Sequence, residues 1–258
     1  MHFYTSMKFS AFTRFFSLTF LLLLSCKKEK MPAPSNLREL SLEIRHQSLG
    51  NPLTYDAPVA DSSGCLLRFT RFQYYLSGIR LETDNPADAW IQPSSFHLIK
   101  ALDNGGKSLV ALSGIPERPF KYLVLHIGLD SLVNHAAGGT GALDPGNGMY
   151  WSWSGEYKFM VLEGNYQHSD SSGAFLFHIA GDPCYREIRL PLAPENGSPV
   201  SLSGKSAIQL DAEIAALFAW PNRLDLRAFN NVMSLESGAG LMAENYSGRF
   251  FRVSGLKN

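Results

Sequence analysis

The stretch Gly141-Ala-Leu-Asp-Pro-Gly-Asn-Gly-Met-Tyr-Trp-Ser-Trp-Ser-Gly-Glu-Tyr-Lys-Phe-Met-Val-Leu-Glu-Gly164 says more about the fold than any other part of the chain. Its residues 144–148 supply the preset and positive φ angles of a tight turn, and large aromatic rings follow at once. We interpret the stretch as a structural corner of an all-β domain. Trp151 and Trp153, one residue apart, would point the same way from a strand, so they also suit a binding wall or oxidative chemistry.

Alternation with a period of two recurs along the chain and predicts strands. Leu40, Leu42, Ile44 and His46 share one face of the first strand, which places His46 on an apolar face. The apolar phase slips between 67 and 81, which indicates a bulge or a change of sheet. Further strands are expected at 96–101, 122–129, 157–162, 175–179, 185–192 and 205–212. Helical periodicity is scarce, with short helices expected only at 213–219 and 241–249.

The predicted fold is therefore an antiparallel β-sandwich with one or two short helices. No linker rich in proline or serine and no internal repeat interrupts the chain after Asn36, so residues 37–258 are expected to form one domain. Lysine and arginine together number 23, as do aspartate and glutamate, and the basic residues are dispersed. This balance gives no reason to expect a nucleic-acid partner.

The first residues resemble an export signal. Lys8 and Arg14 form a basic start, and the apolar run from 15 to 24 is too short for a comfortable membrane span of roughly 20 residues. A cysteine at the end of this run resembles a bacterial lipobox. We expect a signal peptide at 1–25, a lipid anchor on Cys26 and a solvated tether at 26–36, with a single transmembrane anchor as the alternative. The protein would then be exported and held at the membrane of the cell envelope, on its periplasmic or surface side.

Cys65 and Cys184 are the cysteines that remain beside Cys26. In an oxidising compartment the two thiols can pair as a disulfide. The sequence leaves open whether their Cα atoms come within about 7 Å of each other, as a disulfide requires. The alternatives are two buried thiols or one soft metal ligand.

Motifs of catalysis are absent. The chain lacks the serine hydrolase elbow, the His-Glu-x-x-His zinc motif and the phosphate-binding glycine loop, so an enzyme is not expected. Asp144 and Asn147 lack the alternating oxygen ligands of a calcium loop, and turn formation explains Asp144 more simply. Neutral imidazoles from distant strands can meet in a sandwich and bind copper or zinc. His46 and His178 are the candidates, because both lie in apolar strand contexts.

Several segments, taken in order, resemble the MbnP-like copper-binding domain. They are the segment at 72–81 (Phe-Gln-Tyr-Tyr-Leu-Ser-Gly-Ile-Arg-Leu), Ile-Gly-Leu-Asp-Ser at 127–131, the opening stretch, Phe-His-Ile-Ala-Gly at 177–181, Asn-Asn-Val-Met at 230–233 and Glu-Asn-Tyr at 244–246. The chain looks like an MbnP-like lipoprotein of the bacteroidete type.

The resemblance implies an exported β-sandwich that binds or handles copper through histidines. In some relatives a tryptophan assists the histidines in binding copper, after a dihaem partner enzyme has oxidised it to kynurenine. By position, His46 matches the histidine that closes the first strand, and His178 matches the one in the Phe-His-Ile-Gly segment. These two are the predicted metal ligands, with Trp151 or Trp153 as the tryptophan that would be modified.

Three departures from the family pattern keep a second hypothesis open. The C-terminal segment 252–258 lacks a histidine, no tryptophan lies within two residues of a histidine, and Ala180 replaces the usual glycine. The alternative is a binding or structural module without a metal, which presents its aromatic loop to a partner or a glycan.

Overall fold

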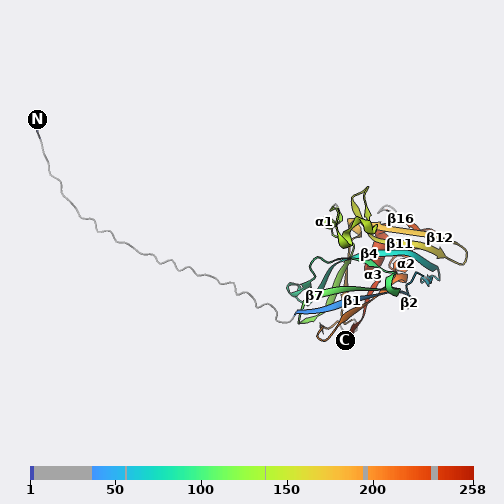
Figure 1. Cartoon of the computed structure of the whole chain (residues 1–258), viewed down its shortest axis with the longest axis horizontal. Coiled ribbons are helices and arrows are strands. Elements are labelled where there is room, and N and C mark those ends of the chain that lie inside the picture. The colour runs from blue at the N-terminus through green and yellow to red at the C-terminus, as the bar shows by residue number, and fades with distance from the viewer. Residues whose placement is uncertain (3–36, 56, 137, 194–196, 234–237) are drawn as a thin grey trace. The chain divides into compact units, whose positions relative to one another are not determined.

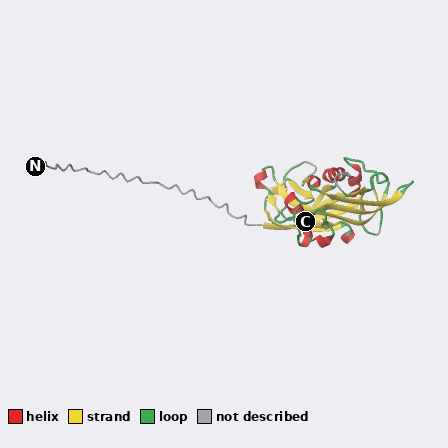
Figure 2. Cartoon of the chain, turned by 90° about the horizontal axis from the view of Figure 1, so that it is seen from above, coloured by secondary structure: helices red, strands yellow, loops and turns green. Residues whose placement is uncertain are grey.

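The computed structural model describes residues 1–2, 37–55, 57–136, 138–193, 197–233 and 238–258. The predicted lipidation site Cys26, the tether and the signal peptide beyond residue 2 lie outside the described residues. Within the described part, no helix is both long and apolar enough to cross a membrane. Strands are the predominant secondary structure of the folded unit, as Figure 2 shows.

The smaller sheet is built around the first strand (Figure 1). Its order is β17-β15-β1-β2, and β7 also pairs with β1. Its strands are β1 (Leu37–Ser48), β2 (Asn51–Pro52), β7 (Lys107–Pro116), β15 (Ala207–Glu213) and β17 (Phe251–Lys257). β1 runs parallel to β15 and antiparallel to β7, so the sheet is mixed and not purely antiparallel.

The larger sheet, in the order β13-β9-β4-β11-β12-β16, is also mixed and curls into a half-barrel. Its main strands are β4 (Leu66–Glu82), β9 (Tyr122–Ile127), β11 (Glu156–Gln167), β12 (Ser172–Ala180), β13 (Arg186–Pro191) and β16 (Asn231–Val232). Short strands at its margins are β3 (Val59–Ala60), β5 (Trp90–Ile91), β6 (Phe96–Lys100) and β10 (Tyr150–Trp151). A separate pair consists of β8 (Pro119–Phe120) and β14 (Val200–Ser201).

The described helices are short: α1 (Ser131–Asn134), α2 (Ile214–Ala219) and α3 (Ala239–Gly248). The last two confirm the helices expected at 213–219 and 241–249. α2 packs against α3, and α3 also contacts β12 and β13. The described 3-10 turns are Pro86–Asp88, Asp103–Gly105, Gly141–Leu143, Pro145–Asn147 and Asp182–Cys184.

The phase slip in the sequence of β4 corresponds to two bulges. Arg71 pairs with Glu163 and Phe69 with Gly164, so the single residue between Phe69 and Arg71 is unpaired in this ladder. A second register shift separates Ser77 from Arg80 where β4 meets β9. Because each extra residue reverses the face that follows, the apolar positions change phase while the strand stays in one sheet.

The two sheets face each other across an aromatic core. The His46 ring, on β1, makes edge contacts with Phe72 and Tyr74 of β4, at centroid distances of 6.0 and 5.8 Å. Phe250, which precedes β17, and Phe251, its first residue, also pack against Tyr74, at centroid distances of 5.8 and 6.0 Å. This packing of one sheet on another confirms the predicted β-rich sandwich with short helices.

The turn in the 141–164 stretch forms as its sequence predicts. The Asp144 carboxylate accepts a hydrogen bond from the Gly146 amide at 2.7 Å, and Gly148 has a φ of 73°. Met149 then enters the core with no exposed surface. The Arg71 guanidinium donates to the Gly148 carbonyl at 3.1 Å and so ties the turn to β4.

Candidate metal centre at His178

His46 is a fully hydrogen-bonded core residue. Its Nδ1 lies 2.9 Å from the Gly106 carbonyl oxygen, and its Nε2 lies 2.9 Å from the Tyr74 hydroxyl. A carbonyl can only accept, so Nδ1 carries the proton and Nε2 accepts from Tyr74. Burial lowers the pKa of His46 to about 4, which keeps the ring neutral. Its lone pair is already engaged, so His46 offers no free nitrogen to a metal.

His178 has the opposite character. It lies on β12 with 8% of its surface exposed, and its Nε2 is 2.7 Å from Oε1 of Glu163 on β11. Its Nδ1 is buried and has no hydrogen-bond partner among the described residues. Burial lowers the pKa of His178, although the bond to Glu163 acts in the other direction. A neutral ring donates from Nε2 to the carboxylate, which leaves the Nδ1 lone pair free.

The strand register places the two histidines on opposite faces of the larger sheet. Paired residues on neighbouring strands share a face. Tyr74, which bonds His46, pairs with Met160 on β11, whereas His178 pairs with the next residue, Val161. Since neighbouring residues of a strand point to opposite faces, the sheet itself separates the two imidazoles. The structure therefore does not bring together His46 and His178, the two residues predicted as metal ligands.

Trp151 lies beside His178, where the sequence shows no such neighbour. The ring centroids are 6.1 Å apart with an interplanar angle of 52°. Trp153 packs against Trp151 at 5.3 Å, and the Lys158 ammonium lies 5.6 Å from the Trp151 ring centroid. Both tryptophans therefore lie at the margin of the His178 site, Trp151 partly buried and Trp153 76% exposed.

Glu163 and Arg71 hold the site together. The Arg71 Nη1 lies 3.5 Å from Oε1 of Glu163, the same oxygen that bonds His178. Arg71 also bonds the carbonyls of Asn147 and Gly148 in the turn that leads to Trp151. One guanidinium thus links the carboxylate that orients His178 to the loop that carries Trp151.

Residues 37–234 match the model of the MbnP family. The chain belongs to the MbnP family. Among solved structures, MbnP from Methylosinus trichosporium matches with 13% identity and a TM-score of 0.47, over 73% of this chain and 80% of that one. No curated protein matches the chain.

In this member of the MbnP family, His126, His135 and His168 have contacts with residues other than His178. His97 Nε2 and His126 Nδ1 are, like Nδ1 of His178, buried without a hydrogen-bond partner among the described residues. His126 stacks on Tyr185 at 4.6 Å, and His168 bonds Asp170 at 2.7 Å. His135 lies beside Asp182, with Nε2 3.3 Å from the carboxylate. In the described part of the chain, no three or more His, Cys, Asp or Glu side chains are grouped so that they could hold a metal ion.

Of the alternatives that the sequence leaves open for Cys65 and Cys184, the structure has two buried, free thiols. Cys65 precedes the first residue of β4. Cys184 lies two residues before Arg186 of β13. Arg186 pairs with Ile127 of β9, and Ile127 pairs with Leu76 of β4. Leu76 is ten residues along β4 from its first residue, Leu66. That length of strand spans roughly 30 Å, far beyond the reach of a disulfide.

Sequence analysis of this MbnP-family chain missed Glu163 and Arg71. Each stands next to a buried apolar residue, Glu163 beside Leu162 and Arg71 beside Phe72. A charged residue next to buried apolar residues in a strand could have indicated this site, because a partly buried charge needs a partner. The partners themselves depend on strand pairing, which the sequence does not specify.

Proposed function

We propose that this chain is an exported, lipid-anchored member of the MbnP family that binds copper, with His178 as its imidazole ligand. The observation that carries the proposal is the buried, unpartnered Nδ1 of His178. Family membership supports copper as the metal, and the lipobox-like cysteine at Cys26 supports export and anchoring at the cell envelope. We propose no catalytic activity for the chain itself.

The His178 site fits one part of a copper centre. A carboxylate that accepts from the far ring nitrogen fixes the tautomer and raises the basicity of the ligating nitrogen, which is the role the geometry gives Glu163. Imidazole suits copper, and a bound copper ion would supply redox or carrier chemistry. A closed four-ligand zinc site does not fit, since the described residues contain no group of three or more His, Cys, Asp or Glu side chains that could hold a metal ion.

Trp151 is the tryptophan we propose for modification. Its ring lies against His178, so an oxidised side chain at this position would lie beside the imidazole. A dihaem partner enzyme, of the kind implied by the family, would act on it from outside. The exposed Trp153 is the neighbouring surface that such a partner would meet first.

Metal and intact-mass analysis of the mature protein tests this proposal. Protein isolated without oxygen and loaded with Cu(I) should retain about one copper per chain. His178→Ala should abolish retention while leaving the fold intact. Stoichiometric retention by that variant would overturn the assignment of His178. An unmodified mass for the native protein would overturn the oxidation of Trp151.

A second candidate is a surface module that binds without metal. Trp151, Trp153 and Met233 line a groove of about 590 Å³ together with His135, Glu156 and Asp182. The exposed ring of Trp153 beside carboxylates suits stacking against a sugar or a partner side chain. This function predicts normal partner binding in His178→Ala and loss of binding in Trp153→Ala, the reverse of the copper proposal.

A further inference from the structure

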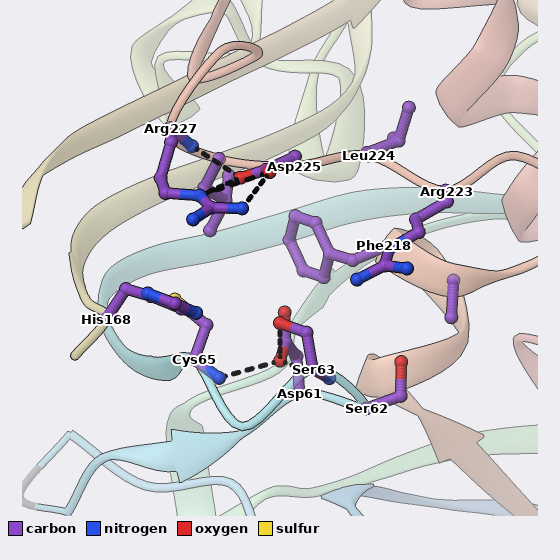
Figure 3. Close-up of a pocket in the computed structure, with 12 residues that line it drawn as sticks. Asp61, Ser62, Ser63, Cys65, His168, Phe218, Arg223, Leu224, Asp225 and Arg227 are labelled. Atoms are coloured by element: carbon purple, nitrogen blue, oxygen red, sulfur yellow. Dashed lines mark hydrogen bonds and ion pairs between the residues drawn. The ribbon is translucent and has the colours of Figure 1, made fainter. Parts of the chain in front are cut away.

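A cavity of about 260 Å³ lies away from the His178 site, at the end of the larger sheet where β11 and β12 meet. It is enclosed by the 61–65 turn before β4, by His168, by the end of α2 and by the segment 223–227 (Figure 3). The volume is below the roughly 300–1,000 Å³ typical of pockets for drug-sized ligands, so the cavity suits a smaller molecule. Gln167 is the last residue of β11 at this end, and Val161 of the same strand pairs with His178. The two β11 residues are six positions apart, which is roughly 20 Å along a strand.

Most charges around the cavity are already paired with each other. Arg227 forms hydrogen bonds to both carboxylate oxygens of Asp225, and its Nη1 lies 3.5 Å from Asp170. His168 bonds the other oxygen of Asp170 at 2.7 Å. These groups form one network along the wall of the cavity, in which their polar atoms already bind one another.

Two opposite charges remain outside this network. Arg223 makes no hydrogen bond or ion pair with any residue that the structure describes, and in Figure 3 its guanidinium extends toward the cavity beside the Phe218 ring. Asp61 is 6% exposed, and its Oδ1 accepts from the Ser63 amide, the Ser63 hydroxyl and the Cys65 amide. The described residues supply no such donor to its Oδ2. Asp61 and Arg223 line the same cavity without forming an ion pair.

We propose that this cavity binds a free α-amino acid. Its carboxylate would take the two donors of the Arg223 guanidinium, and its ammonium would donate to Oδ2 of Asp61. A simple anion would leave Asp61 unpaired, and a simple cation would leave Arg223 unpaired, so a zwitterion matches the cavity better than either. Phe218, Leu224 and Leu226 supply the apolar wall for a side chain. The proposal is independent of copper.

Two substitutions remove one charge each while keeping the local structure. Asp61→Asn retains an Oδ1 that can accept the three hydrogen bonds of the turn but loses the carboxylate charge. Arg223→Gln changes an exposed side chain without a described partner. Arg118→Gln is the control, a half-buried arginine paired with Asp88 at 3.4 Å and absent from the cavity lining.

Isothermal titration of the purified protein with L-serine and L-leucine tests the proposal. We expect binding to weaken at least about tenfold in Asp61→Asn and in Arg223→Gln, and to stay unchanged in Arg118→Gln. N-acetyl-L-leucine and L-leucinamide, which each lack one charge, should also bind at least about tenfold more weakly than L-leucine. Equal binding of either analogue, unchanged binding in both variants, or no binding of amino acids at millimolar concentration would overturn the proposal. Circular dichroism confirms that each variant is folded.

Discussion

The imidazole of His178 lies beside the indole of Trp151, with 6.1 Å between the ring centroids. The two residues are distant in sequence and meet because β10 and β12 both pair with β11. A local pairing of tryptophan and histidine, missing from the sequence, is thus supplied by the fold. Nδ1 of His178, which has no hydrogen-bond partner among the described residues, is part of the ring that contacts Trp151.

Replacing Glu163 should weaken copper binding without removing the ligand. Glu163→Gln keeps an oxygen that can accept from Nε2 of His178 but loses the charge that makes the ring more basic. We expect copper affinity to fall about 10- to 100-fold, measured by competition with a Cu(I) chelator. Glu187→Gln, beside His126 at 3.5 Å, is the control and should bind copper normally. Equal loss in both variants would contradict a specific role for Glu163.

His46 should control stability at acid pH. Burial lowers its pKa to about 4, whereas the pKa in the unfolded chain is about 6.5. Protonation therefore favours the unfolded chain, so the contribution of the neutral ring is complete above pH ~6.5 and is lost as the pH falls toward 4. We expect this residue to account for about 3 kcal/mol of the free energy of unfolding lost over that window.

Urea unfolding of the native protein and of His46→Gln, at several pH values between about 4 and 7, measures this contribution. Other groups titrate in the same window, so the quantity of interest is the difference between the two slopes. The native protein should lose stability more steeply than the variant. Parallel slopes would show that His46 is not the buried neutral group described above.

The two tryptophans should differ in their effects on stability. Trp153→Ala removes a ring that is 76% exposed, and we expect a loss of less than about 1 kcal/mol. Trp151→Ala removes contacts with His178, Trp153 and Lys158, and should cost about 1–3 kcal/mol. Denaturant unfolding separates the two cases. A larger loss for Trp153→Ala would contradict the placement of the pair.

Both core cysteines should be reduced and slow to react in the folded protein. Burial raises the pKa of Cys184 to about 11 and also raises that of Cys65, so neither forms a ready thiolate at neutral pH. In a Cys26→Ser chain, an alkylating reagent should label both Cys65 and Cys184 in denaturant. In buffer without denaturant, it should label both thiols much more slowly. Mass spectrometry of the unreduced, denatured protein checks this. A protein that takes up no label in denaturant would contain the disulfide.

Much of the fold could be predicted because local patterns record it. Alternation at Leu40, Leu42 and Ile44 predicted β1, and the phase slip near Phe69 predicted a bulge in β4. The strands β7 and β17 were missed. In β7 the residues Ser113, Gly114 and Pro116 weaken the pattern, and in β17 Ser254 and Gly255 do the same.

The candidate site was only half predictable. His178 and Trp151 were named from the sequence, but their contact depends on which strands pair and in what register. The same register puts His46 on the other face of the sheet, beside Tyr74. An apolar context alone does not distinguish a histidine with both nitrogens bonded from one with a free nitrogen. That distinction is a property of tertiary hydrogen bonding.

We propose that His178, and not His46, provides the imidazole ligand for copper. The most direct test is the copper content of three folded proteins, the native chain, His178→Ala and His46→Ala, after identical loading with Cu(I) and removal of free metal. We predict about one copper per chain in the native protein and in His46→Ala, and none in His178→Ala. Full copper retention by His178→Ala, with loss in folded His46→Ala, would contradict the claim.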